Sequence, residues 1–328
     1  MVQTPVLTSR WESTRVPRSG TMFCVKKSVT PVRYTALHID VARFATDDFN
    51  PFHDKHKWAR IEGNPFGGPI VLGFQLSAYV AHAVWSISDE PARRLRYSHV
   101  RVTYADAVRV DETVTLTIKP PQWTDDGQQI SHRIALRTPR SLAMTGHLRF
   151  TQKPAHDAPP PVQPLSLNRI RDRTNVPGTE YFLKRKYMTT ANAKNFLIGA
   201  GVEPSLYLDE LDDRINFPEL FPVSMISCAL LERGVKRHYD FLGRPMVYAY
   251  HDIVIDREAI GRLKSNDTVN ILVSNARVAA AEAFGTGLRR GQQMHHCLGY
   301  SGLGEWIFQA EIGLVPLASL LAKSSTET

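Results

Sequence analysis

The stretch Ile70-Val71-Leu72-Gly73-Phe74-Gln75-Leu76-Ser77-Ala78-Tyr79-Val80-Ala81-His82-Ala83-Val84-Trp85 is apolar on nearly every side when it is placed on a helix. A helix at the surface of a globular protein would show a polar face, and this one does not. At about sixteen residues, with Gln75, Ser77 and His82 inside it, the stretch is also too short and too polar to span a bilayer. It therefore predicts a helix in the centre of a folded domain.

Four strand-like segments follow this helix. They cover residues 97–104, 112–119, 129–138 and 142–151, and the second of them alternates strictly between polar and apolar residues. Turn-forming residues, among them Asp125-Asp126-Gly127 and Pro139, separate the last three segments. A buried helix followed by an antiparallel meander predicts an α+β domain in which the sheet covers the helix.

The second half of the chain repeats this order. Residues 221–231 predict an apolar helix, and strand-like segments follow at 246–255, 267–273, around 276–284, 292–299 and 305–315. The runs Asp111-Glu112-Thr113-Val114-Thr115-Leu116 and Asn266-Asp267-Thr268-Val269-Asn270-Ile271 also resemble each other. We therefore expect an internal duplication, with two antiparallel sheets that each wrap around a buried helix.

Six prolines lie between Lys153 and Gly178, with few large apolar residues among them. Such a segment is typical of an extended, semi-rigid connector that buries no core. It predicts a first domain over residues 1–152, a linker over 153–178 and a second domain over 179–328. Each domain would have the size of one compact unit.

The composition of the 328 residues is that of an ordinary globular protein, with 43% hydrophobic and 22% charged residues. The formal net charge of +8 favours an anionic partner, but the basic residues are scattered in twos and threes, which is not typical of a nucleic-acid-binding protein. Three widely separated cysteines indicate free thiols in a reducing cytoplasm, and we expect neither a signal peptide nor a membrane segment.

The segment that most clearly carries residue types used in catalysis is Asp48-Phe49-Asn50-Pro51-Phe52-His53, just before the predicted central helix. A carboxylate and an imidazole are the usual partners in acid–base catalysis, and Asn-Pro favours a turn that can bring both to one side. The spacing alone is weak evidence. The glycine-rich run Gly67-Gly68-Pro69 and Gly73, which leads into the helix, strengthens it.

Together, Asp48-Phe49-Asn50-Pro51-Phe52-His53 and Gly68-Pro69-Ile70-Val71-Leu72-Gly73-Phe74 resemble the MaoC-like (R)-specific enoyl-CoA hydratases and 3-hydroxyacyl thioester dehydratases. The resemblance is specific over about 30 residues and architectural elsewhere. It implies a double hotdog fold, and it implies a carbon–oxygen lyase that hydrates 2-enoyl thioesters or dehydrates 3-hydroxyacyl thioesters.

The resemblance also implies roles for individual residues. Asp48 and His53 would form the catalytic dyad, and Asn50 would order the loop that carries them. The backbone N–H of Gly73, or of its neighbour Leu72, would stabilise the negative charge that develops on the thioester oxygen. The substrate would be an acyl thioester of coenzyme A or of an acyl carrier protein, and the reaction would need no cofactor.

Leu72 departs from the family pattern, which has His before the glycine, and Phe74 replaces the usual Met. Two alternatives therefore stay open. The first is a catalytically degenerate protein that binds acyl thioesters without converting them. The second is a hotdog thioesterase, which would release a free thiol from the same substrates.

The second half contains no Asp-x4-His pair after residue 178, so we expect a non-catalytic domain there. His295-His296-Cys297 is a poor metal site because neighbouring residues on a strand point to opposite faces. Two basic groups, Arg93, Arg94 and Arg96 in the first half and Lys184, Arg185 and Lys186 in the second, could receive the phosphates of coenzyme A or an acidic carrier protein. Two such chains could also form a homodimer.

Overall fold

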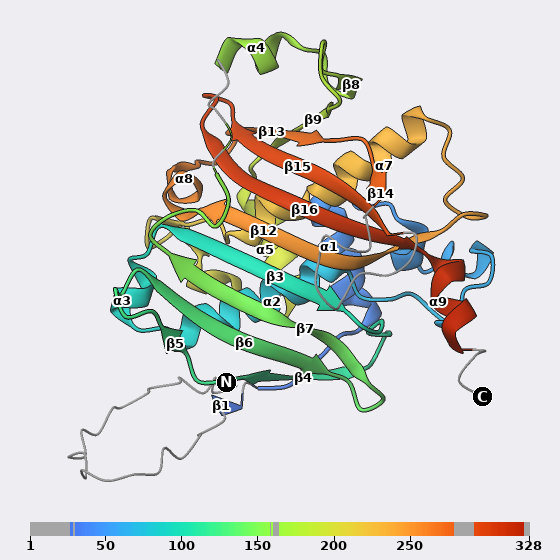
Figure 1. The fold of residues 1–328 in the computed structure, drawn as a ribbon, viewed down its shortest axis with the longest axis horizontal. Helices are drawn as coiled ribbons and strands as arrows, with labels where there is room; N and C mark the ends of the chain where they lie inside the picture. The colour runs from blue at the N-terminus through green and yellow to red at the C-terminus, as the bar shows by residue number, and fades with distance from the viewer. Residues whose placement is uncertain (1–26, 29, 158, 160–163, 279–291, 325–328) are drawn as a thin grey trace.

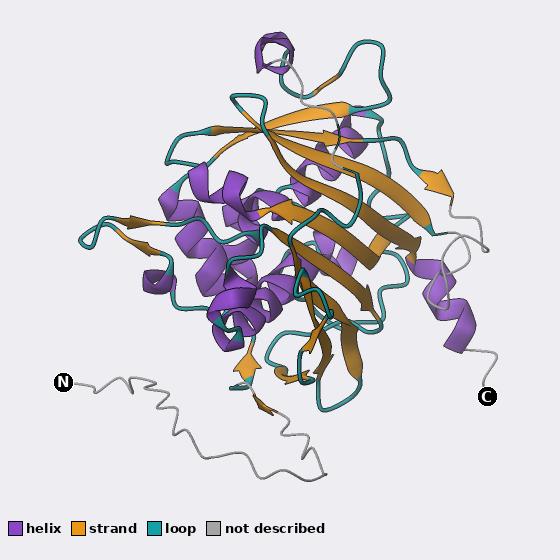
Figure 2. Cartoon of the chain, turned by 60° about the vertical axis from the view of Figure 1, so that its left-hand side comes forward, coloured by secondary structure: helices purple, strands orange, loops and turns teal. Residues whose placement is uncertain are grey.

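The computed structural model describes residues 27–28, 30–157, 159, 164–278 and 292–324 of the chain. Its central feature is one large antiparallel sheet that curves around the helices. The helices α1, α2, α5 and α7 lie on one side of this sheet (Figure 1), and Figure 2 shows the same layering after a rotation. The structure is therefore an α+β arrangement in which the sheet covers the helices, as the sequence predicts.

The first half of the sheet has the strand order β4-β6-β7-β3. These strands are β3 (Tyr97–Tyr104), β4 (Thr113–Ile118), β6 (Gln129–Arg137) and β7 (Leu142–Thr151), and the short strands β1 (Lys27–Ser28), β2 (Val32–Arg33) and β5 (Gln122–Trp123) pair at its margin. They pack around the buried helix α2 (Gly73–Ile87). All four predicted strands and the predicted central helix are present, with ends displaced by at most three residues.

The second half has the strand order β12-β16-β15-β13-β9-β8 around helix α7. Its helices α6 (Leu220–Ser224) and α7 (Ile226–Lys236) replace the single helix expected over 221–231. Its strands are β8 (Thr174–Asn175), β9 (Phe182–Tyr187), β12 (Met246–Asp256), β13 (Thr268–Val273), β14 (Arg277–Val278), β15 (Gln293–Ser301) and β16 (Trp306–Pro316). The part of the predicted 276–284 segment beyond Val278 lies outside the described residues.

The two halves are joined edge to edge, because β3 pairs with β12 in antiparallel register. The two sheets expected from the sequence are thus one continuous sheet. Val100 faces Ile253 in this pairing, and an offset of 153 residues relates these two positions. The same offset relates Pro51 to Pro204 and Gly73 to Ile226, which begin equivalent helices in the two halves. The protein is a double hotdog with an approximate internal twofold axis.

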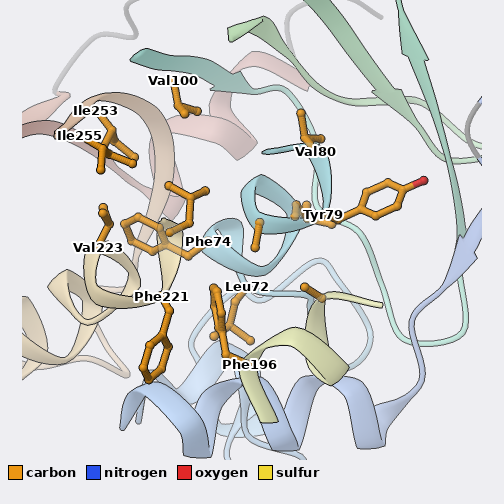
Figure 3. Packing of buried hydrophobic residues seen from close by; sticks show 14 of the residues in the cluster. Leu72, Phe74, Tyr79, Val80, Val100, Phe196, Phe221, Val223, Ile253 and Ile255 are labelled. Atoms are coloured by element: carbon orange, nitrogen blue, oxygen red, sulfur yellow. The ribbon is translucent and has the colours of Figure 1, made fainter. Parts of the chain in front are cut away.

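A layer of two helices that the sequence did not predict covers the central helices. Helix α1 (Ala36–Thr46) packs against its counterpart α5 (Thr190–Ala200). The two helices approach so closely that a Cβ at Gly199 would lie 2.6 Å from the Cβ of Ala42. Phe196 of α5 and Phe221 of α6 belong to the hydrophobic core that also contains Phe74 and Val223 (Figure 3).

The linker is more structured than its proline content predicts. Its described part contains helix α4 (Pro164–Arg169), and Leu167 packs with Leu183, Leu272 and Trp306 in a small hydrophobic cluster. This cluster is separate from the main core, and Leu167 is only 4% exposed. The segment buries apolar surface because a few aliphatic residues among the prolines suffice to cover one patch of the sheet.

The remaining elements are short. They are α3 (Glu90–Arg93), α8 (Arg257–Arg262), α9 (Leu317–Ser324), the 3₁₀ turns η1 (Pro51–His53), η2 (Trp58–Arg60) and η3 (Pro204–Leu206), and the hairpin β10 (Leu208–Asp209) with β11 (Arg214–Ile215). None of the helices in the described ranges is long and apolar enough to cross a membrane.

Candidate functional site

The loop that follows α1 carries Asp48, Asn50 and His53, and hydrogen bonds fix its conformation. Asp47 ends α1 in the left-handed conformation, and the chain then turns into η1. The backbone N–H of Asn50 donates to Oδ1 of Asp48 at 2.9 Å, and Oδ1 of Asn50 accepts from the backbone N–H of Phe52 at 3.2 Å. Asn50 therefore caps the turn, as its position beside Pro51 predicts. Asp48 is 3% exposed.

His53 is 4% exposed, and its Nδ1 lies 2.8 Å from the backbone oxygen of Ile70. Since a carbonyl oxygen only accepts, Nδ1 carries the proton and donates it, which leaves Nε2 of the neutral ring as a proton acceptor. Burial lowers the pKa of His53, against the opposing effects of Asp48 and the Ile70 carbonyl, and Arg43 lowers it further. A neutral imidazole with an unprotonated Nε2 can accept a proton near neutral pH.

A buried ion pair links the loop to helix α1. Nη2 of Arg43, on α1, donates to Oδ2 of Asp54 at 2.9 Å. Oδ1 of Asp54 accepts from the backbone N–H groups of His56 and Lys57 at 2.8 and 3.0 Å. Arg43 also lies 3.4 Å from Asp40. The sequence motif gives no sign of this pair, which ties α1 to the chain immediately after His53.

The N-terminus of α2 lies beside this loop. The backbone N–H of Leu72 is 3.3 Å from Oε1 of Gln75, so that amide already has an acceptor, and the Leu72 side chain is buried in the core. Gly73 opens the helix, where the backbone N–H has no acceptor within the helix itself. A Cβ at Gly73 would lie 3.1 Å from the ring of Tyr104, which hydrogen-bonds the Gly73 carbonyl at 2.9 Å.

Two adjoining cavities meet at the loop. The first has a volume of about 320 Å³ and is lined by His53, Gly73 and many apolar side chains. The second has a volume of about 180 Å³ and is lined by Asp48. Four residues line both cavities: Asn50, Phe52, Met246 and Tyr248. The Asp48 carboxylate therefore lines one cavity and the His53 imidazole lines the other, on either side of the junction.

The second half of the chain contributes directly to this junction. Tyr248 of β12 is half-buried, and its hydroxyl lies 2.7 Å from Oγ of Ser227 on α7. Burial raises the pKa of Tyr248, and the nearby Asp48 raises it further, so the side chain is a neutral hydrogen-bond donor beside the carboxylate. Sequence reasoning missed Tyr248 because a lone tyrosine in a strand carries no recognisable signal.

The equivalent loop of the second half lacks these groups. Gly201 ends α5 in the left-handed conformation as Asp47 ends α1, and Val202 follows it. Glu203 takes the capping position of Asn50, since its side chain accepts from the backbone N–H of Ser205 at 3.2 Å. Leu206 stands where the first half has His53. The second loop keeps the cap and the 3₁₀ turn, is one residue shorter before the cap, and lacks the carboxylate and the imidazole.

Most of the basic residues that could receive a phosphate are engaged within the protein. Arg94 pairs with Glu90 at 3.2 Å, and Arg96 pairs with Asp256 at 2.6 Å. In the second half, Lys184 lies 3.1 Å from Asp172 and Lys186 pairs with Asp47. These contacts indicate structural roles for four of the six basic residues that the sequence suggested as phosphate-binding candidates.

One group of side chains has the composition of a metal site, and it lies away from the cavities. His99, His156 and Asp252 place one ligand atom each within 4.8 Å of one another. Asp252 already accepts from Nε2 of His99 at 2.5 Å and from the guanidinium of Arg101. The Asp252 carboxylate thus already has hydrogen-bond donors within the protein. We interpret the group as a structural hydrogen-bond network.

Comparison with known proteins places the fold among double hotdog structures. No protein-family model and no curated protein sequence matches the chain significantly. Among the solved structures that resemble it is a protein described as a putative MaoC domain dehydratase from Chloroflexus aurantiacus, with a TM-score of 0.58 and 8% identity over 93% of this chain and 99% of that one. A Mycobacterium tuberculosis protein with a double hotdog fold has a TM-score of 0.54 and 9% identity over 89% of this chain and 96% of that one. A MaoC-like dehydratase from Phytophthora capsici has a TM-score of 0.52 and 14% identity over 91% of this chain and 97% of that one.

Proposed function

We propose that the protein hydrates 2-enoyl thioesters, or dehydrates 3-hydroxyacyl thioesters in the reverse direction, with Asp48 and His53 as its acid–base pair. One observation carries the proposal. Both side chains are buried at the junction of two adjoining cavities, and the helix N-terminus at Gly73 lines the same space as His53. The similarity to solved MaoC-like dehydratases supports it at the level of fold.

In dehydration, Nε2 of His53 would take the proton from C2 of the substrate. The dyad would then return one proton to the departing hydroxyl at C3, so that water leaves and the C2–C3 double bond forms. Hydration is the reverse of these steps. Negative charge builds on the thioester oxygen in both directions, and the Gly73 N–H would stabilise it without reorganisation. The Leu72 amide is already occupied, which favours Gly73 as the donor.

We include three further assignments in this proposal. The acyl group would be carried by coenzyme A or by an acyl carrier protein. Residues 179–328 would form a half without its own dyad, because Leu206 replaces the histidine. The same half would complete the site of the first half through Tyr248 and Met246, which line both cavities.

The direct test is an assay with crotonyl-CoA and longer 2-enoyl-CoA thioesters, following the loss of enoyl absorbance. We expect turnover by the wild type and a loss of at least about 100-fold in kcat for Asp48→Asn, since a positioned acid–base group contributes this much. Equal rates for the two proteins would reject the dyad. Release of free thiol from saturated acyl-CoA would instead support the thioesterase alternative.

The pH dependence provides a second test. His53 must be neutral to accept a proton, and burial lowers its pKa below the usual 6.5. We therefore expect kcat/KM to be constant through neutral pH and to fall only on the acid side, with an apparent pKa below 6.5. Measurement of kcat/KM between pH 4.5 and pH 9 checks this. An activity that is lost as the pH falls from 8 to 7 would contradict it.

A further inference from the structure

The second cavity contains an arginine whose positive charge has no counter-ion in the part of the chain that the structure describes. Arg233 of α7 is 4% exposed and lines the cavity that also contains Asp48. Its Nη1 donates to the Ser274 carbonyl and its Nη2 to Oδ1 of Asn275, while Nε has no hydrogen-bond partner. Both acceptors are neutral. A buried cation without an anion is costly, because desolvation is not offset by a charge of opposite sign.

A second arginine adds to this positive charge. Arg237 lies one helical turn after Arg233, lines the same cavity, and donates from Nη2 to Oδ1 of Asn275 at 2.7 Å. Among the described residues, neither guanidinium lies within ion-pair distance of a carboxylate. His295 lines the cavity as well, and burial lowers its pKa to about 4, so its ring is neutral. The cavity thus has a cationic end.

The position of this cationic end limits what it can bind. Ser227, whose hydroxyl contacts Tyr248 at the junction, precedes Arg233 by six residues on the same helix. At 1.5 Å per residue, the backbone of Arg233 lies about 9 Å farther along. A short acyl chain that starts at the dyad would place its far end there. The phosphates of coenzyme A lie a whole pantetheine arm from the thioester, and its nucleotide exceeds a cavity of about 180 Å³.

We propose that Arg233 and Arg237 bind a carboxylate at the far end of the acyl chain, so that the preferred substrates are thioesters of short dicarboxylic acids. This inference rests on the proposed function, since it places the reacting carbons beside Asp48 and His53. The recognition would be charge-assisted, with guanidinium N–H groups donating to the carboxylate. The first cavity, whose lining is mainly apolar, would then hold the thioester arm next to Gly73.

The test compares the binding of adipyl-CoA and hexanoyl-CoA by calorimetry, because these saturated thioesters differ only in the terminal carboxylate and cannot be hydrated. We expect the wild type to bind adipyl-CoA at least about tenfold more tightly. Arg233→Gln and Arg237→Gln should each reduce this preference to about threefold or less and leave hexanoyl-CoA binding unchanged. Arg94→Gln, an exposed arginine paired with Glu90, is the matched control and should retain the full preference.

Two results would overturn the inference. The first is equal binding of the two thioesters by the wild type. The second is an equal loss for both thioesters in the arginine variants, which would assign the guanidiniums to the phosphates of coenzyme A. Arg237→Gln keeps the test valid if Arg233→Gln fails to fold, because Arg237 is exposed. The carboxylate preference without turnover of any enoyl thioester would uphold the subsite and reject the proposed reaction.

Discussion

Replacing His53 by glutamine is expected to lower kcat for enoyl-thioester hydration by about 100-fold or more while KM changes by less than about threefold. Glutamine can still donate a hydrogen bond to the Ile70 carbonyl, so the loop should keep its shape. Glutamine cannot accept a proton near neutral pH, so we expect only the rate of the chemical step to fall. Steady-state kinetics with a 2-enoyl-CoA substrate provide both constants.

The matched control for this prediction is His56→Gln. His56 lies three residues farther along the same loop, and its side chain is exposed. Only its backbone N–H is used, in the hydrogen bond to Asp54. We expect wild-type kinetics from this variant. Similar losses in the two variants would show that the loop tolerates no substitution and that His53 has no special role.

The second large effect is expected for Arg43→Met, which leaves the buried carboxylate of Asp54 without its guanidinium. Loss of one partner of a buried ion pair typically costs about 3–5 kcal/mol. We expect the free energy of unfolding to fall by about 3 kcal/mol, because two backbone N–H groups still bind Asp54 and Nζ of Lys57 lies 3.9 Å from it. The activity should fall as well, since the pair holds the chain just after His53. Urea unfolding and the enoyl assay measure the two effects.

Two further variants separate charge from packing in this prediction. In Arg43→Met/Asp54→Asn the carboxylate charge that has lost its guanidinium is removed, while Asn keeps an oxygen for the backbone N–H groups, so part of the stability should return. Lys55→Met removes the exposed lysine that pairs with Asp40 at 3.7 Å, and it should cost less than about 1 kcal/mol. A double variant that is no more stable than Arg43→Met would argue that Arg43 acts through packing.

Periodicity was sufficient to predict the four long strands of the first half, whereas β9 (Phe182–Tyr187) of the second half was not predicted. The segments 97–104 and 142–151 match β3 and β7 at both ends. The central helix begins at Gly73 rather than at Ile70, because Ile70 forms an isolated bridge with Arg109 and the Val71 amide bonds to Val108. These are contacts with distant residues, and no local pattern contains them. For the same reason the joining of the two sheets through β3 and β12 could not be predicted.

The site was predictable only where it is local in sequence. The motif from Asp48 to His53 places carboxylate, capping amide and imidazole within six residues, and the structure buries the first and the last at one junction. Tyr248 and Arg233 come from the other half of the chain. An arginine in the last turn of a helix is usually a solvated residue that interacts with the helix dipole, so only its burial distinguishes Arg233.

The pairing of β3 with β12 has a consequence for how the protein would behave in dilute solution. If the two halves were separate chains, dissociation would separate the walls of the cavities, whereas here both walls belong to one polypeptide. The specific activity should therefore stay constant as the protein is diluted, and titration with a tight ligand at the dyad should saturate at one molecule per chain. The two halves nevertheless differ at the equivalent position, with His53 in the first and Leu206 in the second.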